Sequence, residues 1–561
     1  MLTKLAGGCL YDPANGRDGA VGDLFVRDGR IVPDPGPDPG PGARPDEVHD
    51  LAGRVVMAGA IDIHSHIAGG KVNIARMLMA EEHRAAAVAA ARPEEMPCRC
   101  GGGIATPSTH VTGCRYAQMG YTAAFEPAML PSNARHAHLE MADIPLIDTG
   151  GYLVLGNDDL LLELLASGAG EEVVADYVGF MLNATRSLAV KAVNPGGINA
   201  FKYNRRRLDL DEAGPFHAIT PRRILTALVA AVQRLGIPHP LHLHGFNLGV
   251  PGNAAATLDS IAAVEGLRLH LTHIQFHAYG DEGDRKFSSA AARIAEEVNR
   301  RPNISVDVGQ IMFGQTVTAS ADTMAQMGNT GLAHPKKWVM MDIECDAGCG
   351  VVPFRYRDKA FVNALQWAIG LELFLLIEDP WRIFLTTDHP NGAPFTSYPE
   401  LIRLLMDRDH RLARMAELHP DLPQHTILGS LTREYTLGEI ATMTRAAPAR
   451  ILGLADRGHL GPGAAADITV YTDRPDRRAM FEAPDLVFKD GRLIVRNGVV
   501  VALAPGRTHV VEPAYDPRIE GWMGRRFDER MGQRLTHFRI AEDEIRDGSA
   551  LVRHACRPDA F

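Results

Sequence analysis

The sequence predicts an α/β protein that contains a (β/α)₈ TIM-like barrel and a small β domain built from both chain ends. From Val55 onward, short apolar strands alternate with Ala- and Leu-rich helical segments, which is typical of βα units around a parallel sheet. Before Val55, and again after about residue 455, short strands and tight turns replace this alternation. The predicted parts are residues 1–54 with 455–510 as the composite β domain, 55–454 as the barrel, and 511–561 as a C-terminal extension.

The two chain ends share a hairpin pattern. Residues 24–32 form two β-rich runs around Asp28-Gly29, a dipeptide favoured in two-residue hairpin turns. Residues 466–471 and 486–501 repeat this pattern, with Asp-Gly and Asn-Gly turns. We therefore expect these strands to form one domain beside the barrel.

Predicted barrel strands end in polar residues. These strands cover residues 55–66, 122–126, 189–194, 241–245, 269–273, 304–308 and 383–388. Helices are expected at 220–235, 257–265, 288–300 and 358–376. Because the active site of such a barrel lies at the carboxyl ends of its strands, candidate functional residues are sought there.

Composition and charge exclude several classes of function. The 561-residue chain is 46% hydrophobic and 22% charged, with a net charge of −10. An acidic balance disfavours nucleic acid and anionic membranes as main partners. No segment reaches the roughly 18 apolar residues of a membrane-spanning helix, and we expect a cytoplasmic protein. Seven scattered cysteines do not predict a disulfide framework, although Cys98-Arg-Cys100 and the pair Cys345 and Cys349 remain minor metal-site candidates.

The strongest local motif is His64-Ser-His66 at the end of an apolar strand. Residues two apart on a strand point to the same face, so both imidazoles can bind one metal ion. A pair of packed histidines is the alternative, but the preceding strand and the glycines that follow favour metal binding. Histidine and carboxylate ligands suit zinc and related divalent ions.

Other strand ends offer similar ligands. His242 and His244 form a second His-x-His pair, and either histidine can be the metal ligand. His273 and Asp388 end two further strands. Lys191 ends an apolar strand, where burying an ammonium group is costly. Lys202 is the alternative candidate for a site lysine, but it lies in a polar segment instead of at a strand end.

The order His-x-His, Lys, His, His, Asp resembles the dinuclear amidohydrolase superfamily, which includes dihydropyrimidinase and hydantoinase. Residues 56–66 and 461–470 resemble its first-strand and C-terminal motifs. The resemblance implies a site with two divalent ions, zinc preferred, and N6-carboxylysine as a bridging ligand. It assigns His64 and His66 to the first ion, His244 and His273 to the second, Lys191 to the bridge, and Asp388 to the first ion and to proton transfer from the attacking water.

Longer stretches narrow the resemblance. Residues 190–197, 241–253, 271–280 and 386–392 are similar to the A subunits of formylmethanofuran dehydrogenases and bacterial formyltransferase/hydrolase complexes. The resemblance implies hydrolysis of formylmethanofuran, or an analogue, to formate and methanofuran. The resemblance places this reaction in one-carbon metabolism and implies that the chain binds the other subunits of such a complex. The alternatives are a cyclic-amide hydrolase of the dihydropyrimidinase or hydantoinase type and an inactive scaffold subunit.

Residues that flank the predicted ligands are candidates for substrate binding. They are Asn247, Gln275, His277, His389 and Asn391. A basic run with Arg205, Arg206 and Arg207 follows Lys202. It can hold an acidic carrier tail, since guanidinium groups bind carboxylates well, although a solvated loop or a subunit contact is the simpler interpretation.

Overall fold

The computed structural model describes residues 1–36, 44–78, 105–201, 208–215, 217–320, 341–342, 350–545 and 551–557. The predictions for Lys202, for the basic run 205–207 and for Cys98, Cys100, Cys345 and Cys349 lie outside these residues. The three described cysteines are free thiols. Within the described part of the chain, no helix is both long enough and apolar enough to span a bilayer.

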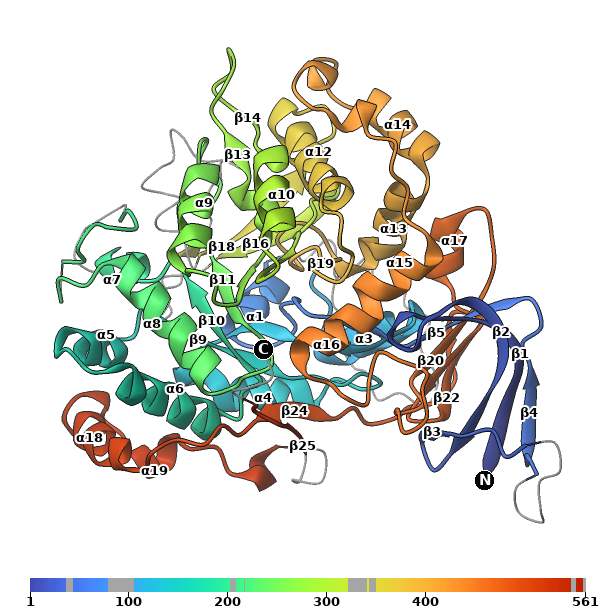
Figure 1. Ribbon diagram of the computed structural model, residues 1–561, viewed down its shortest axis with the longest axis horizontal. Coiled ribbons are helices and arrows are strands. Elements are labelled where there is room, and N and C mark those ends of the chain that lie inside the picture. The colour runs from blue at the N-terminus through green and yellow to red at the C-terminus, as the bar shows by residue number, and fades with distance from the viewer. Residues whose placement is uncertain are drawn as a thin grey trace.

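A closed ring of parallel strands forms the centre of the molecule, which confirms the predicted α/β barrel (Figure 1). Seven strands share one sheet, and β6 and β7 pair with each other. Parallel bridges from Ala123 to Asp148 and from Ser65 to His389 complete the ring. In chain order the barrel strands are β6 (Ala60–Asp62), β7 (Tyr121–Ala124) continued by β8 (Glu126–Met129), β9 (Gly151–Leu155), β10 (Ala189–Val193), β11 (Leu241–His244), β12 (Leu269–Leu271), β15 (Ile304–Asp307) and β19 (Ile383–Phe384).

Helices pack around the ring and supply the outer half of the core (Figure 1). In α8 (Pro221–Arg234), the Thr220 side chain caps the first turn by accepting from the Arg223 backbone N–H at 3.2 Å, and the face with Ile224 and Leu228 is buried. The cap satisfies an otherwise unpaired donor, and the buried face provides most of the stability. The other helices around the ring are α3 (Thr109–Gln118), α4 (Ala134–Ala142), α5 (Asp159–Ala166), α6 (Glu171–Thr185), α9 (Ala254–Ala263), α10 (Ala291–Arg300), α12 (Phe361–Leu376), α13 (Tyr398–Met406), α15 (Leu437–Ala441) and α16 (Ala447–Leu452).

A nine-stranded sheet at one side of the barrel contains strands from both chain ends (Figure 1). Asp28, Asp490 and Asn497 adopt positive φ angles in its tight hairpin turns, as the Asp-Gly and Asn-Gly pairs predict. The strands are β1 (Leu2–Asp12), β2 (Arg17–Arg27), β3 (Arg30–Val32), β4 (Glu47–Asp50), β5 (Arg54–Ala58), β20 (Ile468–Thr472), β21 (Leu486–Lys489), β22 (Arg492–Arg496) and β23 (Val499–Val500).

The predicted strand 55–66 divides at Gly59. Its first half is β5, which pairs with β1 and β20, whereas its second half is barrel strand β6. A side chain at Gly59 would meet Thr122, with an added Cβ only 2.1 Å from the Thr122 hydroxyl oxygen. We therefore propose Gly59, rather than Val55, as the point where the composite domain passes into the barrel.

The C-terminal extension lies along the barrel instead of forming a separate body. Strand β24 (Thr508–Val511) pairs in parallel with β25 (Leu551–His554) and bridges to Thr149 through Thr508. Helix α18 (Arg518–Arg526) packs on α6, and α19 (Leu535–Phe538) follows it (Figure 1).

A buried ionic network joins the composite sheet to the barrel. Arg457 is 1% exposed, and its Nε donates to Asp148 at 2.9 Å. Lys489, fully buried, lies 3.1 Å from Asp148 and 3.1 Å from Asp467. Burial alone would raise the pKa of Asp148, but Lys489 and Arg457 hold it well below its ordinary range.

Replacing Arg457 by Leu is expected to lower the free energy of unfolding by about 3–5 kcal/mol, because removing one member leaves buried charge uncompensated. Arg30→Leu is the control, since Arg30 pairs with Asp456 at the surface with its side chain 48% exposed. Exposed pairs contribute at most about 1 kcal/mol. Urea unfolding of both variants measures the difference; equal losses would contradict the role given to the network.

Candidate active site

The predicted ligands lie at the carboxyl ends of the barrel strands, where the chain is almost fully buried. His64, His66 and Asp388 have ligand atoms within 4.8 Å of one another. Asp388 Oδ1 lies 2.9 Å from His64 Nε2 and 3.4 Å from His66 Nε2. Two imidazole nitrogens and a carboxylate in this arrangement match the ligand types that divalent zinc prefers.

A second group of ligand atoms lies beside the first. His244, His273 and His277 also have ligand atoms within 4.8 Å of one another. The ring of His273 is 5.5 Å from the ring of His64, and 4.6 Å from that of His244. The buried Nδ1 of His273 has no hydrogen-bond partner among the described residues. A ring nitrogen buried in this state fits a metal ligand, because burying a polar atom without a partner is costly.

Lys191 lies near both groups. Its side chain is on β10, 2% exposed, and burial lowers its pKa to about 8, although Asp388 opposes that shift. Its charge in turn acts on His64, His244 and His273. Buried in this way, the lysine is partly uncharged near neutral pH.

Backbone strain accompanies the site. Asn194, Asn247, His273 and Asp388 follow the ends of β10, β11, β12 and β19, and all have φ angles between 36° and 56°. Non-glycine residues rarely adopt this region, and such residues cluster at functional sites. Gly309 permits the backbone at this position to lie close to His273, since a Cβ on residue 309 would be 2.4 Å from the His273 Cβ.

Electrostatics keep Asp388 ionised. Burial raises the pKa of its carboxyl, but the nearby His64 and His273 outweigh that effect and hold it well below the ordinary range. Asn391 Nδ2 also donates to Asp388 Oδ1 at 2.9 Å. An ionised carboxylate fixed beside two imidazoles can both bind a cation and accept a proton.

The residues predicted to bind substrate have different surroundings. His277 joins the second ligand group, and Asn391 contacts Asp388. Gln275 is fully buried and accepts from the Ile311 backbone N–H at 2.9 Å, while His389 accepts from the Phe395 N–H at 3.2 Å. Asn247 is half-buried, and its carbonyl accepts from Asn253. Their roles in substrate binding stay predictions.

Two carboxylates that the sequence did not single out contact the site histidines. Glu126 accepts from His66 Nδ1 at 3.0 Å and from the Ile67 N–H at 2.8 Å. Asp307 lies 3.4 Å from His64 Nδ1 and accepts from the His273 N–H at 2.9 Å. Both come at the ends of predicted strands, so a search for carboxylates at every strand end would have found them.

Replacing Glu126 by Gln is expected to weaken metal binding about 10–100-fold, the usual effect of losing the group that orients a ligand histidine. The amide presents a donor or a weaker acceptor where the His66 N–H requires a carboxylate. Glu140→Gln is the control, since Glu140 accepts from the Gly69 N–H and from Asn73 of the neighbouring helix α1 (Gly70–Met77), and neither bond involves His66. Chelator competition with zinc measures both; equal affinities would contradict this role.

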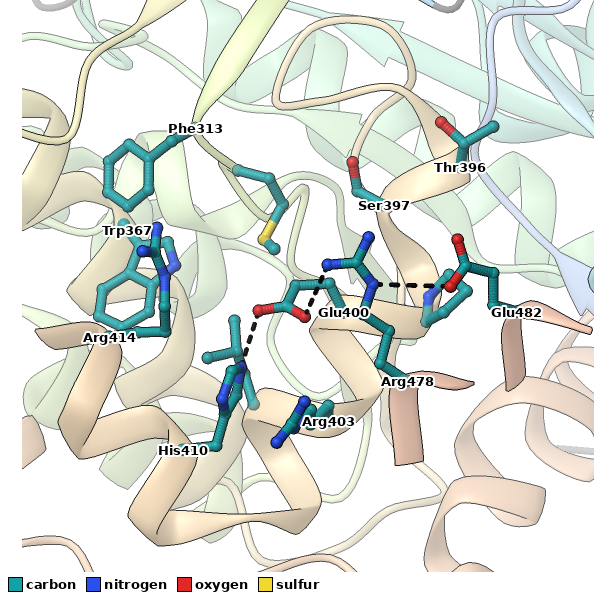
Figure 2. A pocket seen from close by; sticks show the side chains of 13 residues that line it. Phe313, Trp367, Thr396, Ser397, Glu400, Arg403, His410, Arg414, Arg478 and Glu482 are labelled. Atoms are coloured by element: carbon teal, nitrogen blue, oxygen red, sulfur yellow. Dashed lines mark hydrogen bonds and ion pairs between the residues drawn. The ribbon is translucent and has the colours of Figure 1, made fainter. Parts of the chain in front are cut away.

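A separate hollow of about 440 Å³ lies between α13, α14 (Arg408–Ala416) and α17 (Arg477–Glu482) (Figure 2). None of the predicted site residues lines it. Glu400 lies 2.8 Å from His410 Nε2 and 3.6 Å from Arg478, which is 3.7 Å from Glu482. These charged side chains pair with one another, and none of them belongs to the two ligand groups.

Comparisons with known proteins show the family to which the chain belongs. A profile of the amidohydrolase family matches residues 47–502. The chain is 45% identical to the A subunit of the formyltransferase/hydrolase complex Fhc from Methylorubrum extorquens, over 99% of this chain and 100% of that protein. It is 38% identical to protein FwdA from Methanocaldococcus jannaschii, over 90% of each.

One solved structure covers almost the whole chain. The crystal structure of the Methylorubrum extorquens formyltransferase/hydrolase complex FhcABCD with methylofuran contains a chain that matches with a TM-score of 0.92 and 45% identity. The match covers 99% of this chain and 100% of that one. The chain therefore belongs to the amidohydrolase family, in the group that includes FwdA and the A subunit of Fhc.

Proposed function

We propose that the chain is the hydrolytic subunit of a formyltransferase/hydrolase complex and cleaves the formamide C–N bond of a formylated methanofuran-type carrier. The products are formate and the free amine of the carrier, a step in one-carbon metabolism. The observation that carries this proposal is the convergence of two ligand groups and Lys191 at one mouth of the barrel. The related Fhc complex, crystallised with methylofuran, supports the carrier and the partner subunits.

The ligand groups define where two divalent ions, with zinc preferred, would be held. His64, His66 and Asp388 would hold the first ion, and His244 and His273 the second. His277 belongs to the second group by geometry and is a candidate additional ligand. When bound, the ions would supply a lowered pKa for water and polarisation of the formyl carbonyl.

Lys191 is proposed to react with CO₂ and to become N6-carboxylysine. The ammonium would first lose a proton, and the resulting amine would attack CO₂ and release a second proton, which leaves a carboxylate on the side-chain nitrogen. The product would replace a buried positive charge with a negative one and would offer oxygen atoms, a ligand type that divalent ions accept. The burial of Lys191 and its influence on both histidine groups support this assignment.

Asp388 is the proposed proton carrier. A pKa held below the ordinary range keeps the carboxylate ionised at neutral pH, and an ionised carboxylate can accept a proton from the attacking water. It then returns the proton to the leaving nitrogen. Asn391 fixes its orientation by the 2.9 Å hydrogen bond to Oδ1.

The proposal is tested by purifying the chain from its own cells and measuring partners, metal and turnover together. We expect co-purified subunits of a formyltransferase/hydrolase complex, bound zinc, and release of formate from an N-formylated carrier. Turnover of dihydrouracil instead would show a cyclic-amide hydrolase. Absence of any bound divalent ion would show a scaffold subunit.

A further inference from the structure

Three histidines form a continuous buried chain that ends at the candidate metal site. His242 Nε2 lies 2.9 Å from His64 Nδ1, and His242 Nδ1 lies 2.9 Å from His239 Nε2. All three side chains are 0% exposed. This row of histidines therefore begins at His239 inside the barrel. It reaches His64 at Nδ1, the ring nitrogen that faces away from Asp388.

Neighbouring groups hold the middle ring in place. His270 stacks on His242, with ring centroids 4.7 Å apart and planes inclined by 23°. His270 is itself fixed, because its Nε2 donates to Asp307 at 3.1 Å and its Nδ1 lies 2.9 Å from the Ser305 hydroxyl. A ring held on its face and at both nitrogens has little freedom to rotate away from His64.

The chain has a definite polarity once a cation binds. A neutral imidazole carries one N–H and one lone pair. A cation on His64 Nε2 requires the lone pair there, so the hydrogen must be on Nδ1 and must be donated. His242 Nε2 accepts it at 2.9 Å, and His242 then donates its own Nδ1–H to His239.

Two other groups also face His64 Nδ1. The Thr272 hydroxyl is within hydrogen-bond distance, and Asp307 Oδ2 is 3.4 Å away. The hydroxyl can donate or accept, so it does not select one tautomer. The Asp307 carboxylate is shared with His270, the Thr386 hydroxyl and the His273 N–H. Among the described residues, His242 Nε2 is the ring nitrogen within hydrogen-bond distance of His64 Nδ1, at 2.9 Å, and it can accept the Nδ1–H alongside the Thr272 hydroxyl.

We propose that His242, oriented by His239 and His270, is a positioning residue that fixes the Nδ1–H tautomer of His64 and presents its Nε2 to the cation. This inference rests on the proposed metal-dependent function. It also gives His242 a different task from His244, although both belong to one His-x-His motif. His64, His242 and Asp307 have ligand atoms close enough to hold an ion of their own, and the experiment separates that possibility from the hydrogen-bond chain.

The test compares His242→Leu with wild type in the intact complex and measures zinc per chain, zinc affinity by chelator competition, and the visible spectrum after Co²⁺ loading. We expect a 10–100-fold weaker affinity for one of two ions, as for other residues that orient a ligand histidine, and a changed Co²⁺ spectrum. His138→Gln is the control, because His138 is also a buried histidine, at 1% exposure. It lies on α4, and its Nε2 bonds to the backbone carbonyl of Thr185 at the end of α6. This variant should leave the zinc content, the zinc affinity and the Co²⁺ spectrum unchanged.

A second variant covers the case in which His242→Leu does not fold. His239→Asn shortens the chain at its far end without touching His64, and should produce the same changes to a smaller extent. Unchanged affinity and spectrum in a folded His242→Leu or His239→Asn protein would overturn the inference. So would three ions in wild type that fall to two in His242→Leu, since His242 would then be a ligand. A wild-type protein that binds no ion instead refutes the proposed function itself.

Discussion

Asp388→Ala is expected to abolish formate release while the fold remains intact. Loss of a general base alone costs about 10²–10⁴-fold in rate, and this carboxylate also lies within reach of both His64 and His66 as a cation ligand. Removing the carboxylate also breaks its contacts with His64, His66 and Asn391, so some stability is lost, and the fold of the variant must be measured beside its activity. Steady-state formate release and circular dichroism measure activity and fold.

Two further variants make the Asp388 result specific. Asp388→Asn keeps the shape of the side chain but cannot accept the proton, so it should be as inactive as the alanine variant. Asp158→Asn is the control, because Asp158 is a half-buried carboxylate that caps α5 through the Leu161 N–H and accepts from Tyr177. It should keep activity. Near-normal turnover in either Asp388 variant would refute its role as proton carrier.

Lys191→Ala is expected to lose bound metal, with activity falling below detection. The lysine is proposed to provide the only ligand shared by both ions, so its removal affects both histidine groups. Zinc analysis of the purified variant measures the loss, and intact mass spectrometry of wild type should show an adduct of about 44 Da for the added CO₂. Acetate or propionate should restore part of the metal content, because a small carboxylate can occupy the space of the missing side chain.

The control for Lys191 is another buried lysine. Lys489 is also fully buried, but its partners are Asp148, Asp467 and Asp490 of the ionic network. Lys489→Ala should therefore lower stability and leave the metal content per folded chain unchanged. Full zinc occupancy in Lys191→Ala, with no response to carboxylates, would assign the bridge to another residue.

The alternation of apolar strands and helices was sufficient to predict the barrel. The predicted strand ends at residues 189–194, 241–245 and 304–308 agree with β10, β11 and β15 to within one residue. The sequence analysis did not predict β9, Gly151–Leu155, although Asp158 and Asp159 follow this apolar run. It also merged β5 with β6, because one apolar run crosses from the composite sheet into the barrel at Gly59.

The sequence by itself determined which side chains stand at the strand ends, because local periodicity places a strand and the residue that closes it. It left His242 and His244 equivalent, since residues two apart point to the same side of a strand. Only the tertiary structure separates them by depth: His242 meets His64 and His239 inside the barrel, whereas His244 meets His273 and His277. Glu126 and Asp307 gained their contacts in the same way, because strand register and barrel closure bring together residues that no local pattern connects.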